Sequence, residues 1–364
     1  MNDKIVFTRG VPPPEAFPTD ELGECFDAAI KNDTAVVLQY GQQPGYAPLR
    51  RELAGEYGVS ESEVLVGNGS LHLQDLVSAH LVGAASLTAV FTEQPSYDRA
   101  ITTFRRRGAR AIGIPLEEDG ISVERLEAAL TREVPAFVYL VPDFQNPAGA
   151  TLSLEKRQRV VELANEYGFW VIEDVPYRKL RYRGEDLPLL REIDASRVIT
   201  MSSFSKILSP GIRVGFMIAP SGLIGAVTRL GEDTYLSPVL PTQAAVAEYL
   251  RRGWLGPNIE RLKALYTPRW QAMAGAVRRE LSGARTFIPD GGFFVSVMLP
   301  EDANTDNLVG RAKEQGLVLT PGSSFFADPD DGEPTPGDRF VRLPFCAVTP
   351  EQIDEGVRRL ASLL

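Results

Sequence analysis

A lysine among small hydroxyl residues follows one of the apolar runs of the sequence. The run Val198–Met201 leads into Ser202-Ser203-Phe204-Ser205-Lys206, and Arg213 follows seven residues later. A lysine amine forms imines with aldehydes, and hydroxyl groups together with an arginine can hold a phosphate. Buried strands of α/β proteins present their ligands at their ends. The same residues are also typical of a plain surface turn, so this segment alone leaves both interpretations open.

A carboxylate and a phenol follow a second apolar run. Asp174 comes just after Val171-Ile172, and Tyr177 lies three residues further on. A buried carboxylate needs a cation or hydrogen-bond donors, and the protonated nitrogen of a pyridine ring would satisfy it. The phenol could donate to an oxygen of the same ring. The alternative is an aspartate that caps the next segment.

Two more segments place polar groups directly after apolar runs. Asn146 follows Phe137–Val141 and precedes a proline, which makes its amide a neutral donor in a turn. Gly69 and Ser70 lie between Val64–Val66 and a helix-like stretch, where free backbone N–H groups and a hydroxyl form an anion site. Each segment also fits an ordinary turn. The order and strand-end placement of all four favour one shared site for a phosphorylated ring.

Short apolar runs alternate with helix-like stretches through most of the chain. Helical spacing is clear in Ser96–Arg107, Ser122–Leu130 and Leu154–Tyr167. Short buried strands between helices predict a mostly parallel sheet with both faces covered. We therefore predict an α/β fold whose large domain, residues 41–254, holds a seven-stranded sheet. Its strands are expected at Val64–Val66, Leu87–Phe91, Ala109–Ile114, Phe137–Val141, Trp170–Ile172, Val198–Met201 and Val214–Ala219.

The pattern changes after about residue 254 and predicts a smaller α+β domain at 255–364. A long helix over Ile259–Leu281 precedes strands in Thr286–Leu299, which two glycines interrupt. The segment Asp328–Asp338 is rich in Asp, Gly and Pro, and this composition predicts a surface loop. At the other end, Gly10–Pro14 cannot be helical, because proline fixes φ and removes donors. We expect residues 1–40 to form a packed arm and part of the small domain.

Composition limits the partners of the chain. Lys and Arg total 38 and Asp and Glu total 48, so the net charge is −10, which gives no reason to expect nucleic acid or an anionic membrane surface. The two cysteines and two histidines show no metal-ligand spacing, and we expect no metal site. The N-terminus does not resemble a signal peptide, and we find no apolar run of about 18 residues. We expect a cytoplasmic protein.

The ordered motifs resemble those of the class I and II aminotransferases, which are fold-type I pyridoxal-phosphate enzymes. The branch they resemble is that of 2-aminoadipate and kynurenine aminotransferases, which includes the catalytic domains of MocR-type regulators. The resemblance runs from about Ile5 to the C-terminus. It implies a large pyridoxal-phosphate-binding domain, a small domain, and transfer of an amino group between an L-amino acid and a 2-oxo acid. Its further motifs are Gly10 to Phe17-Pro18, Gln39-Tyr40-Gly41, Glu93-Gln94-Pro95-Ser96-Tyr97, Gly291-Gly292-Phe293-Phe294 and Val341-Arg342-Leu343.

The resemblance also implies how the cofactor, pyridoxal 5′-phosphate, is held. Lys206 would carry it as a Schiff base and later move a proton between substrate and cofactor. Asp174 would pair with the ring nitrogen, and Tyr97 would stack on the ring. Asn146 and Tyr177 would contact the ring oxygen. The phosphate would lie against Gly69, Ser70, the backbone of Leu71, Ser203, Ser205 and Arg213.

Substrate and subunit contacts follow from the same resemblance. Arg342 would bind the α-carboxylate, a two-bond task that lysine performs poorly, and Gly10 and Asn146 would also contact the substrate. Tyr40 would reach the phosphate of a neighbouring subunit, which implies a homodimer with shared sites. Arg9, beside the arm, is a candidate for a second substrate carboxylate, and an arginine that points to solvent is the alternative.

Departures from the family pattern leave the substrate open. Leu71 and His72 stand where the family often has glutamine, Ala148 stands in place of threonine, and Pro344-Phe345-Cys346 replaces Asn-Phe-Ser. Another pyridoxal-phosphate reaction, such as elimination, decarboxylation or oxidation, stays an alternative, because the cofactor motifs do not distinguish these reactions. A ligand-sensing regulator is a third possibility, which the intact catalytic residues disfavour.

Overall fold

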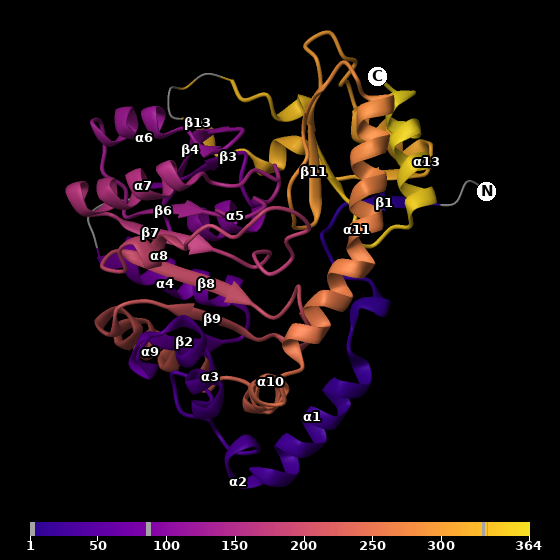
Figure 1. Ribbon diagram of the computed structural model, residues 1–364. Coiled ribbons are helices and arrows are strands. Elements are labelled where there is room, and N and C mark those ends of the chain that lie inside the picture. Colours follow the sequence, from indigo (N-terminus) through magenta and orange to yellow (C-terminus); the bar gives the residue numbers. More distant parts are fainter. Residues whose placement is uncertain (1–3, 85–88, 330–331, 333) are drawn as a thin grey trace.

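A nine-stranded sheet forms the centre of the protein and fills the left half of Figure 1. This computed structural model describes residues 4–84, 89–329, 332 and 334–364. The strands lie in the order β13-β4-β3-β6-β7-β8-β9-β2, and β5 pairs with β4. They are β2 Val64–Gly67, β3 Ala89–Gln94, β4 Arg110–Glu117, β5 Gly120–Ile121, β6 Phe137–Leu140, β7 Trp170–Asp174, β8 Val198–Ser203, β9 Gly215–Ile218 and β13 Asp328–Pro329.

Each of the seven longer strands overlaps one of the seven predicted apolar runs. Along the main order, neighbouring strands are parallel except at β9, which is antiparallel to both β8 and β2. The prediction of an α/β fold with a mostly parallel central sheet is confirmed. The predicted count of seven strands is wrong, because the short strands β5 and β13 also pair with β4 and bring the described sheet to nine strands. Leu87 and Thr88, which we predicted in the second strand, lie outside the described residues.

One predicted loop is partly a strand. Asp328 and Pro329, the first residues of the Asp328–Asp338 segment, form β13 and pair with Ile112 and Gly113 of β4. An edge strand pairs with only one neighbour and tolerates proline. It therefore does not need the alternating apolar residues by which a strand is predicted from sequence. Residues 330, 331 and 333 of the predicted loop lie outside the described part of the chain.

Helices cover both faces of the central sheet, because its strands carry apolar side chains on both sides. In β6, Phe137 and Tyr139 belong to the core beneath α4 and α5, whereas Val138 and Leu140 belong to the core beneath α6 and α7. The helices of this half are α3 Ala47–Tyr57, α4 Ser70–Ala84, α5 Asp98–Arg106, α6 Val123–Leu130, α7 Leu154–Tyr167, α8 Leu190–Ile193, α9 Ser221–Tyr235 and α10 Leu240–Arg251.

A second, smaller unit stands beside the central sheet (Figure 1). Its antiparallel sheet has the order β10-β11-β14, and the N-terminal strand β1 pairs in parallel with β12. Phe7 of β1 is fully buried in the core of this unit. The elements of this unit are β1 Ile5–Phe7, α11 Leu255–Glu280, β10 Arg285–Phe287, β11 Phe294–Met298, α12 Leu308–Glu314, β12 Leu317–Leu319, β14 Phe340–Pro344 and α13 Pro350–Ala361. The helices α1 Thr19–Asn32 and α2 Thr34–Val37 pack instead against α10, and Leu22 and Val37 belong to the core of the central half.

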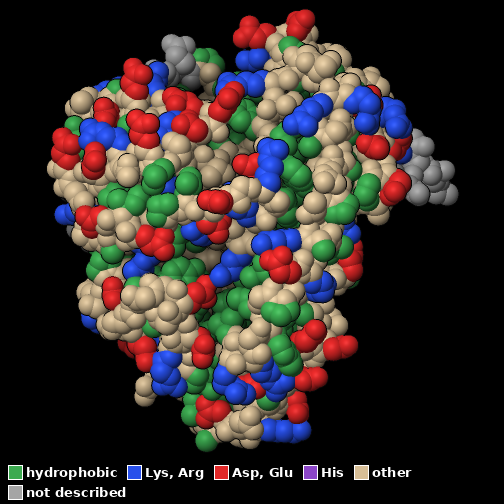
Figure 2. Space-filling view, in the orientation of Figure 1, with side chains coloured by type: hydrophobic (Ala, Val, Ile, Leu, Met, Phe, Trp, Pro, Cys, Tyr) green, Lys and Arg blue, Asp and Glu red, His purple; other side chains and the backbone are tan. Residues whose placement is uncertain are grey.

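The long helix α11 spans both parts of the molecule. In Figure 1 it rises from beside α10 to the small sheet, where it packs against α13. In Figure 2 acidic and basic side chains are interspersed over the visible face. Within the described residues, no helix is long and apolar enough to cross a membrane.

Candidate active site

The strand order brings five predicted site residues together at the carboxyl ends of the strands of the central sheet. Tyr97 follows β3, Asn146 follows β6, Asp174 ends β7 and Lys206 follows β8. Gly69 follows β2, which is parallel to β8 because two antiparallel steps through β9 restore the direction. The carboxyl ends of all five strands therefore lie on the same side, where ligands bind in such sheets.

Lys206 is enclosed by aromatic rings and by the N-terminal segment. Its Nζ donates to the carbonyl of Gly10 at 2.7 Å and lies 5.9 Å from the ring of Tyr177 and 6.0 Å from that of Phe293. Burial lowers the pKa of Lys206 to about 8, because the charged amine loses its hydration. A larger share of neutral amine near neutral pH suits a lysine that attacks an aldehyde.

Asp174 is a buried carboxylate with one oxygen in use. Its Oδ2 accepts from the hydroxyl of Tyr139 at 2.9 Å, while the buried Oδ1 has no partner among the described residues. Burial raises the pKa of Asp174 to about 6, against the stabilising effects of Tyr139 and Lys206. A buried oxygen without a donor is costly, and the N–H of a protonated pyridine is the kind of donor that fits.

The segment expected to hold a phosphate is built around Gly69. Its φ is +97°, and a Cβ at this position would lie 2.2 Å from Nη2 of Arg213. Arg213 donates to the carbonyls of Pro210 and Asn68, each at 3.2 Å, which holds the guanidinium against the glycine. Only a residue without a side chain allows this approach.

Strand register completes the same corner of the sheet. Gly215 of β9 pairs with Gly67 of β2 on one side and with Ser203 of β8 on the other. Ser70 begins α4, so the backbone N–H groups of its first turn, including that of Leu71, point out of the helix. Ser203 and Ser205 are buried beside them. The residues fit a phosphate at a helix N-terminus.

Two further predicted site residues, Tyr97 and Tyr177, both lie close enough to Asp174 to interact with its charge. Tyr177 is buried, with its ring edge-on to Phe293 and Phe294 at centroid distances of 5.5 and 5.7 Å. Burial, with the nearby charges of Asp98 and Asp174, raises the pKa of Tyr97 to about 12. Both phenols therefore stay protonated and able to donate at neutral pH.

Arg342 approaches the site from β14 of the small sheet. Its Nη1 donates to Oδ1 of Asn146 at 2.8 Å, and Nη2 donates to the carbonyl of Thr8. The guanidinium carbon lies 4.8 Å from the ring centre of Phe294 and 4.4 Å from that of Phe325. The buried Nε has no hydrogen-bond partner in the described part of the chain. The group is held between two rings with donor capacity to spare for an anion.

Gly10 lets the N-terminal segment pass close to these rings. A Cβ on Gly10 would lie 2.4 Å from Cζ of Phe294, so a larger residue would push the segment away. The Gly10 carbonyl accepts from Lys206, and the neighbouring Thr8 carbonyl accepts from Arg342. The segment thus lies directly over the lysine and the arginine.

Tyr40 and Arg9 lie outside this cluster. The side chain of Tyr40 is 76% exposed on the single chain, and Arg9 is also exposed. An exposed tyrosine cannot serve the site of its own chain from there. The positions that depart from the family pattern are mostly inside: Ala148 and Cys346 are buried, and His72 packs edge-on against Tyr235 at 4.5 Å.

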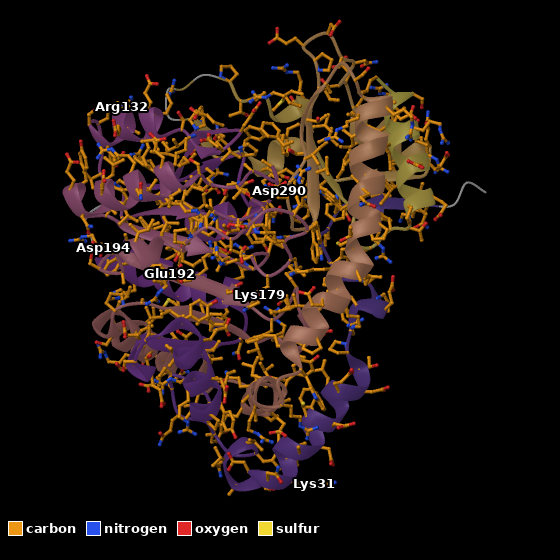
Figure 3. All side chains as sticks on the ribbon, viewed as in Figure 1. Lys31, Arg132, Lys179, Glu192, Asp194 and Asp290 are labelled. Carbon is orange, nitrogen blue, oxygen red and sulfur yellow. The ribbon has the colours of Figure 1, made fainter. Side chains whose placement is uncertain are left out.

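The segment after Tyr177 links the two parts of the molecule. The backbone N–H of Tyr182 donates to the Asp290 carbonyl at 2.7 Å, and its hydroxyl donates to the Gly292 carbonyl at 2.6 Å. Figure 3 shows Asp290 between the central sheet and the small sheet. This contact fixes Phe293 and Phe294, which follow the glycines, beside Tyr177.

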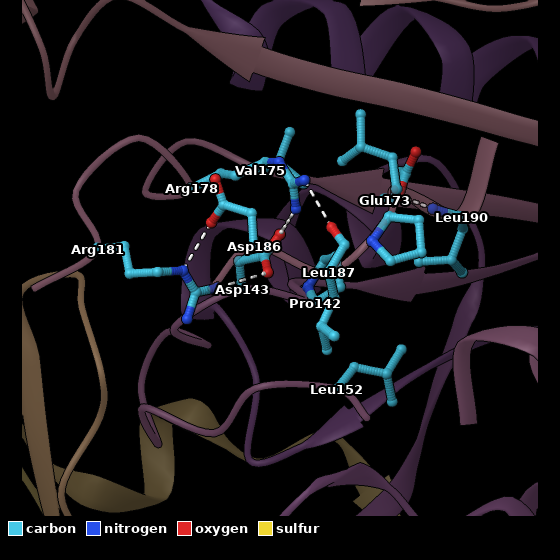
Figure 4. A network of polar contacts seen from close by, with 12 residues as sticks. Pro142, Asp143, Leu152, Glu173, Val175, Arg178, Arg181, Asp186, Leu187 and Leu190 are labelled. Atoms are coloured by element: carbon cyan, nitrogen blue, oxygen red, sulfur yellow. Dashed lines mark hydrogen bonds and ion pairs between the residues drawn. The ribbon is translucent and has the colours of Figure 1, made fainter. Parts of the chain in front are cut away.

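A buried ionic network around Asp143 stabilises the turn that carries Asn146. Asp143 accepts from Arg157 at 2.8 Å and from Arg178 at 3.0 Å, and Arg181 lies 3.7 Å away (Figure 4). The guanidinium of Arg181 also lies over the ring of Phe144, 4.7 Å from its centre. Paired charges of this kind keep the turn in place, because breaking a buried pair leaves an uncompensated charge.

Several residues beside the site were missed by sequence reasoning. Tyr139 resembles a core residue of an apolar run, and the Thr8 carbonyl belongs to the backbone. Glu93 accepts from Val141 N at 3.0 Å and from Gln145 Nε2 at 3.1 Å, which joins the Tyr97 and Asn146 segments. Only Glu93 carried a signal, as a charged residue at the end of an apolar strand.

Comparison with known proteins identifies the family. Residues 3–360 match the model of the aminotransferases of class I and II. The chain belongs to this family. A 2-aminoadipate transaminase from Thermus thermophilus is 37% identical over 99% of this chain and 90% of that protein. The aromatic-amino-acid aminotransferase 1 of Thermococcus litoralis is 32% identical over 100% of this chain and 88% of its own length.

A solved structure supports the same conclusion. The alpha-aminoadipate aminotransferase LysN of Thermus thermophilus, complexed with N-(5′-phosphopyridoxyl)-L-leucine, has a TM-score of 0.90 to this chain. It is 36% identical, and the match covers 99% of this chain and 92% of that one. The chain is a pyridoxal-phosphate-dependent aminotransferase, and our predictions of family, cofactor and amino-group transfer are confirmed. The roles of individual residues and the domain boundaries stay predictions.

Proposed function

We propose that this aminotransferase acts on L-α-amino acids with a free carboxylate, at the site formed by Lys206, Asp174, Asn146 and Arg342. The observation that carries the proposal is the buried Oδ1 of Asp174, which lacks a donor among the described residues and shares the site with Lys206. The Arg342 guanidinium lies against two aromatic rings, and its buried Nε has no partner among the described residues. This arrangement supports the proposal that Arg342 binds the α-carboxylate of the substrate.

Each residue has a definite task in this proposal. Pyridoxal phosphate supplies an electron sink for the charge that develops at the substrate α-carbon. Lys206 takes the α-proton on Nζ and returns it, with a pKa near 8 that suits both steps. Asp174 accepts the ring N–H on Oδ1, and Arg342 donates two N–H groups to the α-carboxylate. Asn146 keeps its amide N–H₂ for the ring oxygen, since its Oδ1 already accepts from Arg342.

The remaining residues bind the phosphate and close the site. Gly69, Ser70 and Arg213, which lie together at the start of α4, would hold the phosphate there. Gly10, through its close approach to Phe294, lets the N-terminal segment lie over Lys206 and Arg342, where it would cover the substrate. Burial beneath this segment excludes water, which strengthens the electrostatic contacts inside.

An amino-donor experiment tests the reaction. Adding an amino acid to the holoenzyme without any 2-oxo acid should convert the cofactor to pyridoxamine phosphate once and then stop. A 2-oxo acid should restore the original absorbance. Continuous turnover without an acceptor would instead favour elimination, decarboxylation or oxidation on this scaffold.

We also infer a homodimer in which Tyr40 serves the neighbouring subunit. The exposure of its ring on the single chain supports this arrangement. Mixing inactive Lys206→Ala and Tyr40→Ala chains tests it, because hybrid dimers would hold one site with both mutations and one with neither. Activity should reappear on mixing under exchange conditions. A mixture that stays inactive while the chains do exchange would contradict the shared site.

A further inference from the structure

The carboxylate of Asp174 has a hydrogen-bond donor that lies outside every segment so far given a role. Tyr139 of β6 donates its hydroxyl to Oδ2 at 2.9 Å. Tyr139 is fully buried, and Asp174 is 7% exposed, so water does not compete for the bond. The two oxygens of the carboxylate therefore differ, because Oδ2 is held while Oδ1 is without a donor among the described residues.

The sheet places these two side chains on the same face. Tyr139 pairs with Ile172 across β6 and β7, and Asp174 follows Ile172 by two residues. Side chains two residues apart on a strand point to the same side, so the phenol reaches the carboxylate along the diagonal. On that face Phe104 packs edge-on against the Tyr139 ring, with centroids 5.5 Å apart. This contact fixes the direction of the hydroxyl.

We propose that Tyr139 is a positioning residue that keeps Asp174 ionised and aims its free oxygen at the ring nitrogen of the cofactor. This inference rests on the role proposed above for Asp174. Burial raises the pKa of Tyr139 well above its usual range, so the phenol keeps its proton at every working pH. Its hydrogen bond lowers the pKa of Asp174, which opposes the burial that raises that pKa to about 6.

Other ionisable groups also face Asp174, from three elements. Lys206 follows β8, Tyr97 precedes α5 and Tyr177 follows β7. Of these, the positive charge of Lys206 stabilises the carboxylate, while the two phenols carry no charge at neutral pH. Lys206 is committed to the cofactor when the site is loaded. Tyr139 is then the described protein group that continues to stabilise the carboxylate.

The experiment compares two ligands on the apo-protein, so that it does not depend on turnover. One ligand is pyridoxal phosphate, and the other is its 1-deaza analogue, which has carbon in place of the ring nitrogen. Tyr139→Phe should weaken the binding of pyridoxal phosphate by about tenfold and leave the analogue unchanged, since only the former needs an ionised Asp174. Tyr249→Phe, a buried tyrosine of α10, is the matched control and should change neither.

The pH dependence gives a second readout. Affinity for pyridoxal phosphate should fall on acidification as Asp174 takes a proton, and the midpoint should move to higher pH in Tyr139→Phe because the pKa of Asp174 rises without its donor. Should that variant not fold, 3-fluorotyrosine at position 139, a stronger donor of nearly the same shape, should move the midpoint to lower pH. An unmoved midpoint in the folded variant tested overturns the inference.

Two further outcomes separate this inference from the proposal on which it rests. Equal loss of both ligands in Tyr139→Phe would mean that Tyr139 has a merely structural role, and it would leave the role of Asp174 intact. Wild-type protein that binds both ligands equally at every pH would overturn the role of Asp174 itself, and the inference with it.

Discussion

Replacing Arg342 by glutamine should slow the reaction of amino acids and spare that of amines without a carboxylate. The guanidinium is fixed between the rings of Phe294 and Phe325, and its Nε is free of partners in the described structure. A charge-assisted hydrogen bond contributes about 1.5–3 kcal/mol. Two such bonds to the α-carboxylate amount to about 3–6 kcal/mol, so kcat/KM should fall by roughly 10²–10⁴-fold.

The same substitution also has a structural cost, which the assay must separate. Without Arg342, Oδ1 of Asn146 and the carbonyl of Thr8 lose their donor, and a loss of about 1–3 kcal/mol in unfolding free energy is expected from such buried acceptors. Any loss of activity that results from this destabilisation should be the same for every substrate. The loss of the hydrogen bonds to the α-carboxylate should slow the reaction only of substrates that carry a carboxylate.

Single-turnover formation of pyridoxamine phosphate separates the effect on the carboxylate from any general loss of activity. An amino acid and the amine left after its decarboxylation are compared in wild type and in Arg342→Gln. The ratio of their rate constants should fall by roughly 10²–10⁴-fold in the variant, and Arg342→Lys should lie between, because an ammonium cannot form the two-bond fork. Equal losses for both compounds would refute the assignment of Arg342 to the α-carboxylate.

Three other predictions follow from single contacts. Gly69→Ala should weaken binding of pyridoxal phosphate to the apo-protein by about tenfold or more, because a Cβ would lie 2.2 Å from Arg213 at a φ of +97°; an unchanged Kd in equilibrium dialysis would contradict this. The uptake rate of pyridoxal phosphate should rise with pH and level off above about 8, because burial lowers the pKa of Lys206 and only the neutral amine attacks; a rise that continues to the ordinary pKa of 10.5 would speak against it. Gly10→Ala should cost about 1–3 kcal/mol of unfolding free energy, because its Cβ would lie 2.4 Å from Phe294; denaturant titration measures it, and a wild-type midpoint would show that the segment yields without cost.

The sequence predicts the cofactor side of the site better than its supporting contacts. Lys206 and Asp174 are polar residues at the ends of apolar runs, and the strand order alone brings such ends together. Tyr139 gives no such signal, because an aromatic residue inside an apolar run resembles a core residue until its strand neighbour is known. The Thr8 carbonyl is invisible for another reason, since every residue has one.

Subunit contacts and edge pairing lie further from what a single sequence can predict. Tyr40 is exposed on the single chain, so its proposed role needs a second copy that local patterns do not encode. The short strand at Asp328 and Pro329 is held by backbone pairing with β4, which needs no particular side chains. The proposed role of Tyr40 thus depends on another copy of the chain, and the strand at Asp328 depends on a partner strand distant in sequence.

Reductive trapping of the cofactor tests the central assignment most directly. Holoenzyme treated with borohydride, digested and analysed by mass spectrometry should carry the phosphopyridoxyl group on the peptide that holds Lys206. Lys179, which pairs with Glu56 on the surface at 2.6 Å, should stay unmodified and serves as an internal control. A stable phosphopyridoxyl group on any other lysine, or on none in protein that binds the cofactor and turns over, would contradict the role of Lys206.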